Sequence, residues 1–226
     1  MTLCVIPARG GSKRIPRKNL RDFCGRPMIA WPIAAALESG CFDRVVVSTD
    51  DPEIAAAARA AGAETPFERP AALADDHAPT RPVIAHAIEV LEAEGPVCCL
   101  YATAPFVLAK DLRSGLSRLG DDGVTYAFPV TRYAFPIQRA LRMGPGNAVK
   151  MVQPEHFGTR SQDLEEAWHD AGQFYWADAG QWRTDAPIFG PGAVGLPVPR
   201  KRVQDIDTEE DWQLAELLFR AQGLDR

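Results

Sequence analysis

Short runs of consecutive apolar residues alternate along the chain with longer segments in which apolar residues recur three and four positions apart. The short runs are typical of strands buried on both faces of a sheet, and the longer segments are typical of helices that pack on one side. Their alternation predicts βαβ units and a mostly parallel sheet. We expect strands at residues 2–6, 44–49, 63–67, 97–101, 124–130, 173–177 and 194–198, and helices at 27–39, 50–61, 80–94, 110–119 and 208–221.

The alternation stops between about residues 131 and 170. This stretch contains turn signals such as Gly144-Pro145-Gly146, short β-like pieces and aromatic residues at positions that we expect to be exposed. We interpret it as an inserted arm of hairpins, better suited to contact a partner subunit or a substrate than to join the central sheet. Residues 1–226 are then expected to form a single domain that carries this arm.

Composition narrows the class of protein. The chain has 226 residues, a formal net charge of −5 and a 46% apolar share, which suits a sizeable α/β core and argues against a general nucleic-acid binder. No apolar run approaches the roughly 20 residues of a membrane span, and the first residues lack the pattern of a signal peptide. Five cysteines without a C-x-x-C pair fit reduced thiols. We therefore expect a cytoplasmic protein that binds neither nucleic acid nor membrane.

The loop that follows the first expected strand reads A-R-G-G-S-K-R-I-P-R-K-N, residues 8–19, with five basic residues and no acid. Gly10 and Gly11 permit backbone conformations that a Cβ would forbid, so that several N–H groups can converge on one anion. This combination predicts a grip for a nucleotide triphosphate. The loop matches neither the P-loop nor the G-x-G-x-x-G pattern, and on its own it is equally compatible with a solvated turn.

Other polar segments should meet this loop, because ligands bind outside the carboxyl ends of the strands in an open parallel sheet. Ser48-Thr49-Asp50-Asp51 follows one expected strand and residues 101–106 follow another. The two aspartates could cap the helix that comes next, or the segment could contact a ribose or base through its backbone. The sequence leaves both possibilities open.

Asp205 and Asp207 are separated by one residue. On an extended segment this spacing places both carboxylates on one side, with Ile206 directed into the core. Two carboxylates suit Mg²⁺, which takes its other ligands from substrate phosphates and water. The alternative is helix capping, in which Asp207 pairs with Glu210 three residues later.

Arg160 lies in the irregular region before a returning strand. A planar guanidinium is the usual partner of a substrate carboxylate. An ion pair with Asp163 or Glu165 is the equally reasonable alternative.

The run I-P-A-R-G-G-S-K-R-I-P-R-K-N, residues 6–19, resembles the signature of the cytidylyltransferases that activate nine-carbon acidic sugars, the CMP-sialic acid synthetases and their relatives. V-S-T-D-D, E-R-P-A-A-L-A-D-D and D-I-D-T-E-E-D follow in the same order. At three places the chain differs from the sialic acid enzymes and resembles the branch of the family that acts on pseudaminic acid. They are Arg14 in place of a glycine, Y-A-T-A-P-F at 101–106 in place of a Q-P-T-S-P-L-like segment, and Asp170-Ala171-Gly172 in place of N-G-A. Sialic or legionaminic acid is the alternative substrate.

The resemblance implies a Rossmann-like fold, with a mostly parallel sheet in a three-layer sandwich, and a homodimer formed partly through the arm. It also implies Mg²⁺ and the reaction of CTP with the sugar to give CMP-sugar and pyrophosphate. A nucleotide-sensing module that uses the same loop is the rival from another class, and Asp205-x-Asp207 argues against it. The implied nucleotide contacts are Ala8, Arg9, Gly10, Gly11, Ser12, Lys13, Lys18, Asn19, Arg69 and Thr80; the sugar contacts are Tyr101, Thr103, Arg160, Gln162 and Gln173; the metal ligands are Asp205 and Asp207; and Arg9, Lys13 and Asp207 are catalytic.

Overall fold

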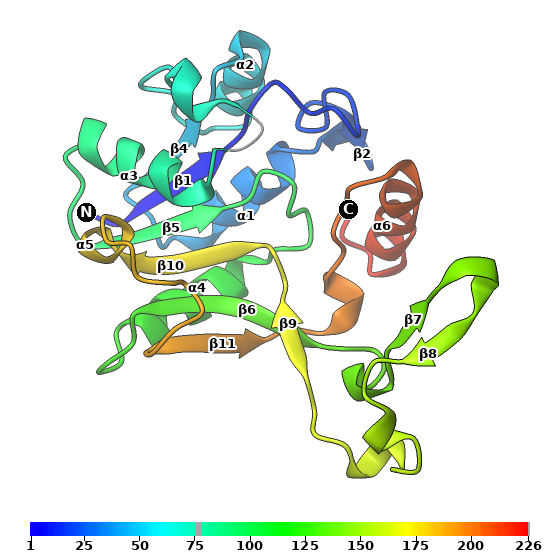
Figure 1. Ribbon diagram of the computed structural model, residues 1–226. Helices are drawn as coiled ribbons and strands as arrows, with labels where there is room; N and C mark the ends of the chain where they lie inside the picture. The colour runs from blue at the N-terminus through cyan, green and yellow to red at the C-terminus, as the bar shows by residue number, and fades with distance from the viewer. Residues whose placement is uncertain (76–77, 226) are drawn as a thin grey trace.

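One seven-stranded sheet forms the centre of the molecule (Figure 1). The structure is a computed structural model that describes residues 1–75 and 78–225. The strand order is β11-β6-β10-β5-β1-β4, and β9 pairs with β6 at one end. The strands are β1 (Leu3–Pro7), β4 (Arg44–Ser48), β5 (Pro96–Leu100), β6 (Tyr126–Arg132), β9 (Trp168–Asp170), β10 (Phe174–Asp178) and β11 (Ala193–Pro197).

The first strand, β1, is the middle of the parallel part of the sheet. It pairs in parallel with β4 on one side and with β5 on the other, and β11 pairs in parallel with β6. β10 runs antiparallel between β5 and β6, and β9 is also antiparallel to β6. The expected mostly parallel sheet is therefore confirmed, with two reversed strands that the sequence pattern did not distinguish from the others.

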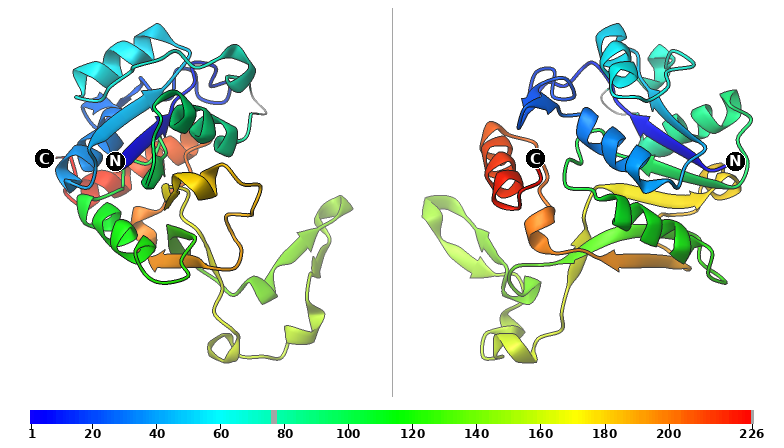
Figure 2. Two further views of the ribbon diagram at one scale, coloured as in Figure 1. Left: turned by 90° about the vertical axis from the view of Figure 1, so that its left-hand side faces the viewer. Right: turned by 180° about the vertical axis from the view of Figure 1, so that it is seen from behind.

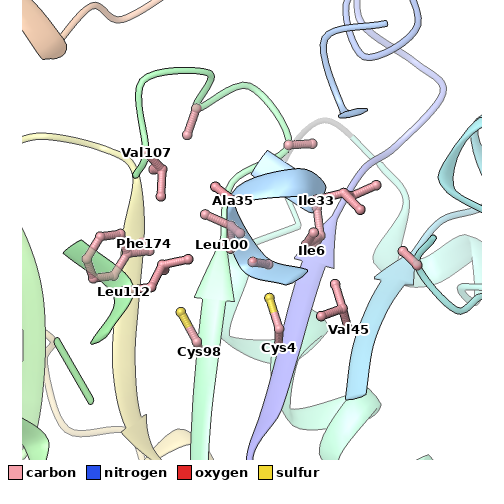
Figure 3. Close-up of a cluster of buried hydrophobic side chains, with 14 of the residues drawn as sticks. Cys4, Ile6, Ile33, Ala35, Val45, Cys98, Leu100, Val107, Leu112 and Phe174 are labelled. Carbon is pink, nitrogen blue, oxygen red and sulfur yellow. The ribbon is translucent and has the colours of Figure 1, made fainter. Parts of the chain in front are cut away.

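Helices cover both faces of the sheet, which confirms the three-layer arrangement (Figure 2). Alternate residues of each strand face opposite sides, so Cys4 and Ile6 of β1 pack in one core cluster while Leu3 and Val5 pack in another. Figure 3 shows the first cluster, to which Cys4, Cys98 and Phe174 contribute from three neighbouring strands. No helix within the described residues is long and apolar enough to cross a membrane. The first face carries α1 (Ala30–Ser39), α2 (Pro52–Ala60) and α4 (Ala109–Leu119), and the second carries α3 (Thr80–Val90) and α5 (Ala179–Trp182).

The last helix, α6 (Glu209–Ala221), packs on a third apolar cluster beyond the sheet. Phe23, from the short hairpin that β2 (Asp22–Phe23) and β3 (Arg26–Pro27) form, contacts Trp212 and Phe219 of α6 edge to face, with ring centroids 5.4 and 5.2 Å apart. Edge-to-face pairs add to the stabilisation that burial of the rings supplies. This packing holds the C-terminal segment against the first thirty residues of the chain.

The arm leaves the sheet after β6 and returns at β9, so the excursion itself spans residues 133–167 (Figure 1). It consists of the hairpin β7 (Leu141–Met143) and β8 (Val149–Met151) together with short 3₁₀ turns. Several of its apolar side chains are exposed, and Phe135 and Phe157 are 82% and 81% accessible. An exposed apolar surface of this kind is typical of an interaction site.

Two local predictions are wrong. Residues 63–67 form no strand, because their sheet contact is a single bridge between Glu64 and Val46. The helix expected from residue 27 starts three residues later, since Pro27 belongs to β3 and its partner across the hairpin is Asp22. A proline at a strand end and a proline in the first turn of a helix both satisfy its fixed φ, so composition alone did not separate them.

Candidate functional site

One pocket of about 430 Å³ gathers eight of the seventeen residues predicted for the site. It lies at the carboxyl ends of β1 and β5, where a ligand of an open α/β sheet is expected. Four cationic side chains line it against one carboxylate, so it is strongly positive in a protein whose net charge is −5. The lining residues are Pro7, Arg9, Ser12, Lys13, Arg14, Lys18, Asn19, Tyr101, Ala102, Thr103 and Asp207.

The glycine loop is held in shape by its own polar side chains. Asn19 is buried and donates from Nδ2 to the Arg9 carbonyl at 3.0 Å. Ser12 donates from Oγ to the Ile15 carbonyl at 2.6 Å, and Ile15 is buried in the third apolar cluster. The amide of Ala8 continues the contact with β4 by donating to Ser48 O at 2.9 Å. These bonds order the loop without any ligand.

The two aspartates after β4 do different things. Asp51 caps α2, because its Oδ1 accepts from the amides of Glu53 at 2.8 Å and Ile54 at 3.1 Å. The capping alternative is thus confirmed for Asp51. Asp50 turns the other way, and its Oδ1 accepts from the Gly10 amide at 3.1 Å.

The expected nest of loop amides is therefore smaller than the sequence suggested. The Gly10 amide is bonded to Asp50, and the Ser12 amide donates to the Gly10 carbonyl at 3.1 Å. Because both donors already have acceptors within the chain, the groups best suited to a phosphate are the cationic side chains around the pocket.

Asp207 faces the same cations. Its Oδ2 lies 2.7 Å from Nη1 of Arg14, and its Oδ1 lies 3.6 Å from Nζ of Lys18. The Lys18 ammonium also donates to the carbonyl of Ile206, a residue that is 188 positions away in the sequence. The packing of α6 thus brings the C-terminal aspartate to the N-terminal loop.

The metal site predicted at Asp205 and Asp207 is only partly assembled at the pocket. Ile206 is buried, as predicted, which directs the flanking carboxylates away from the core. The cap of α6 is formed by Thr208 and Asp211, so the capping alternative for Asp207 is wrong. Asp205 is exposed and does not line the pocket. The described residues contain no cluster of three or more His, Cys, Asp or Glu side chains suited to a metal. Of the predicted pair, Asp207 is the one that faces the pocket, and a metal ion bound there would take its other ligands from phosphates and water.

Arg69 and Thr80 support the site from behind. Arg69 is buried, and its guanidinium donates to the Ser48 hydroxyl at 3.2 Å and to the Ser48 carbonyl, which fixes the end of β4. Burial lowers the pKa of the Arg69 guanidinium, and the nearby Asp50 carboxylate acts in the opposite direction. The Thr80 hydroxyl lies 3.3 Å from the hydroxyl of Tyr101, which lines the pocket, and burial raises the pKa of that tyrosine.

The five predicted sugar contacts are not all in one place. Tyr101 and Thr103 line the pocket. Gln173 is buried behind it and donates from Nε2 to the Arg202 carbonyl at 2.6 Å. Arg160 and Gln162 are exposed on the arm. Arg160 forms an ion pair with Asp163 at 2.7 Å, which was the alternative to its predicted role as a sugar contact. Within residues 1–75 and 78–225, the lining of the pocket includes no arm residue.

A tyrosine next to Tyr101 was missed. The ring of Tyr175 lies 5.6 Å from that of Tyr101, and its hydroxyl donates to Asp170. Burial raises the pKa of the Tyr175 phenol. Residues 101–106 and 170–172 differ from the sialic acid enzymes, and these differences were the sequence signal that could have pointed to Tyr175. Only the fold shows that the two segments are adjacent. The Asp76 end of the E-R-P-A-A-L-A-D-D segment lies outside the described residues.

An α/β sheet with a cationic, glycine-containing loop after β1 defines a nucleotide-binding protein of the Rossmann-like class. Residues 3–184 match the sequence model of the family described as "Cytidylyltransferase". The chain belongs to the cytidylyltransferase family, whose members are nucleotidyltransferases. The resemblance seen in the N-terminal run is thereby confirmed.

Two sequence relatives support membership of this family, and one solved structure shares the fold. It is 44% identical over 222 residues to the pseudaminic acid cytidylyltransferase of Campylobacter jejuni, with 96% of each chain covered. It is 32% identical to the CMP-N,N'-diacetyllegionaminic acid synthase of Legionella pneumophila, covering 96% of this chain and 95% of that protein. A CMP-2-keto-3-deoxy-manno-octonic acid synthetase complexed with CTP shares the fold, with a TM-score of 0.71 at 19% identity over 98% of this chain and 99% of that one. Cytidylyltransferases of this fold generally use a divalent metal ion.

Proposed function

We propose that this protein transfers CMP from CTP to pseudaminic acid, a nine-carbon acidic sugar, with release of pyrophosphate. The observation that carries the proposal is the convergence of Arg9, Lys13, Lys18 and Asp207 on one pocket at the carboxyl ends of the parallel strands. The cations suit the triphosphate, and the carboxylate of Asp207 is an oxygen ligand of the kind that a divalent ion takes together with substrate phosphates. The 44% identity to a pseudaminic acid cytidylyltransferase supports the choice of sugar.

In the proposed reaction the anomeric hydroxyl of the sugar attacks the α-phosphorus in line with the departing pyrophosphate. The side chains of Arg9 and Lys13 offset the charge on the phosphates, and the ordered loop holds them in place. Asp207, with Asp205 two residues before it, would hold the divalent ion, which we propose is Mg²⁺; when bound, such an ion would supply Lewis-acid chemistry that makes a hydroxyl easier to deprotonate. Lys18 keeps Asp207 in position through its bonds to the same segment.

The sugar would lie against Tyr101 and Thr103, with Gln173 behind them. Because Arg160 and Gln162 lie on the arm, they would reach a sugar only in the pocket of a second protomer, across an arm-mediated homodimer. A cytoplasmic location completes the proposal, since all five cysteines are free thiols, as a reducing compartment requires.

The test is pyrophosphate release with CTP, Mg²⁺ and each of three acids: pseudaminic, N-acetylneuraminic and N,N'-diacetyllegionaminic acid. We expect kcat/KM to be highest for pseudaminic acid by at least ~10-fold, since pocket walls that fit one stereoisomer leave polar groups unpaired with another. Omission of Mg²⁺ with added EDTA should abolish release. A preference for either of the other acids would replace the proposed sugar, and no release with any of them would overturn the proposed reaction.

The arm provides a separate prediction. We expect the protein to be a dimer by light scattering at micromolar concentration, and the double variant Phe135→Glu/Phe157→Glu to be a monomer, because two buried charges without partners would oppose association. Leu217→Glu is the matched control, since Leu217 is a 64% exposed apolar residue that belongs to α6 and not to the arm. A dimer that survives the arm substitutions, or dissociates in the control, would contradict an arm-mediated interface.

A further inference from the structure

The loop glycine Gly10 is in contact with both aspartates that follow β4. Its amide donates to Oδ1 of Asp50 at 3.1 Å. A Cβ built on Gly10 would lie 2.7 Å from Oδ2 and 3.0 Å from Cβ of Asp51, closer than such atoms approach one another. The glycine is therefore needed for the close approach of the α2 N-terminus to the loop, whether or not a phosphate is present.

Asp50 is not among the residues that line the cationic pocket. It lines a separate hollow of about 370 Å³ beside α2. Arg9 and Lys13, on either side of the two glycines, line the cationic pocket, and of the described residues neither Asp50 nor Gly10 contributes to that lining. The carboxylate is thus placed to hold the loop from behind.

Charge supports the same arrangement. A carboxylate close to a bound triphosphate would weaken its binding unless a cation compensates it. Asp50 has such a cation in the buried guanidinium of Arg69, with which it interacts electrostatically. Arg69 is itself anchored on Ser48, so its positive charge is held at the end of β4.

We propose that Asp50 is a positioning residue for the triphosphate loop. Its carboxylate holds the Gly10 amide against the end of β4, and this bond aims the segment that carries Arg9 and Lys13 at the phosphates without contact between Asp50 and the nucleotide. The inference rests on the proposed function, because the loop is taken to bind CTP. It follows that a neutral side chain with an oxygen in the same place will do the same work, and that a side chain without an acceptor will not.

The test compares Asp50→Asn with Asp50→Ala by calorimetric CTP affinity and by kcat/KM for CTP. Asparagine keeps the acceptor, so Asp50→Asn should retain at least about a third of the wild-type kcat/KM. Asp50→Ala leaves the Gly10 amide without its bond, and we expect kcat/KM to fall about 10- to 100-fold. The exchange rate of the Gly10 amide with solvent deuterium, measured by NMR, should rise in the alanine variant alone.

Asp51→Ala is the matched control, because Asp51 caps α2 instead of bonding the loop. It should lower the melting temperature by about 2–4 °C with kcat/KM within about twofold of wild type. An alanine variant at position 50 with unchanged kcat/KM, or an asparagine variant as impaired as the alanine variant, would overturn the inference. Calorimetry measures the CTP affinity of the Asp50 variants without any sugar. If no sugar is a substrate, the proposed reaction is overturned, and the CTP affinities still test the role of Asp50.

Discussion

Replacement of Asp207 by alanine is expected to lower turnover at least ~100-fold, a loss of about 2.7 kcal/mol of transition-state stabilisation, while the fold is preserved. Asp207 lies on an extended segment and does not cap α6, so its removal breaks no helix. It is the carboxylate that lines the cationic pocket, next to Arg14 and Lys18. Without it, the proposed Mg²⁺ loses a ligand next to the reacting phosphate.

The Asp207→Ala substitution should change kcat without raising KM for CTP. Removal of a negative charge from a cationic pocket does not weaken its attraction for a triphosphate, so KM for CTP should not rise, although kcat falls. Glu210→Gln is the matched control, because Glu210 is an exposed acid three residues later, and it should leave kcat within about twofold. Calorimetry with Mn²⁺ should show weaker metal binding for Asp207→Ala. Near-normal pyrophosphate release by the folded variant would contradict the metal assignment.

Replacement of Lys13 by alanine should also reduce turnover about 100-fold, but here KM for CTP should rise as well. Lys13 lines the pocket beside Ser12 and Arg14, and its ammonium would interact with the phosphates in both the ground state and the transition state. Uniform loss of such binding raises KM, and the part made only in the transition state lowers kcat. Steady-state kinetics with CTP varied at saturating sugar measures both.

Arg17→Ala is the control for Lys13. Arg17 belongs to the same basic loop but pairs with Glu53 of α2 at 2.6 Å. Its removal takes one positive charge from the loop without touching the pocket lining, so both kinetic parameters should stay within about threefold. If Lys13→Ala behaved like this control, the loop would not be the triphosphate grip.

Most of the fold was predictable because its elements are encoded locally. Strands such as residues 44–48 and helices such as 109–119 lie within one or two residues of the expected bounds. The predictions that failed concern features that depend on which strand lies next to a segment in the sheet. Residues 63–67 have strand-like composition but only one bridge to β4, and β10 is as apolar as its neighbours although it runs the opposite way. Strand direction is decided by the connection and by the neighbours, and no single strand carries that information.

The candidate site shows the same division. The sequence alone indicated the chemistry, since a basic glycine loop and two carboxylates one residue apart point to a phosphate substrate and a metal ion. The sequence did not show which of Asp50 and Asp51 caps the helix. Nor did it show whether Arg160 binds a substrate carboxylate or forms an ion pair. Each of those alternatives depends on which atoms lie within about 3 Å of the side chain, a property of the folded chain.

The sequence by itself therefore determined the class of fold, the family and the residue types available for catalysis, because these depend on local pattern and on the resemblance of whole segments. The tertiary structure decided which of these residues meet. Packing of Phe23 against Trp212 and Phe219 brings Asp207 to the N-terminal loop, where Lys18 bonds the carbonyl of Ile206, 188 positions later in the sequence. The end of β4 brings Asp50 to Gly10, so that the amide predicted for a phosphate is bonded to a carboxylate. Contacts between distant segments are selected by burial of the whole core, and no local window of sequence contains them.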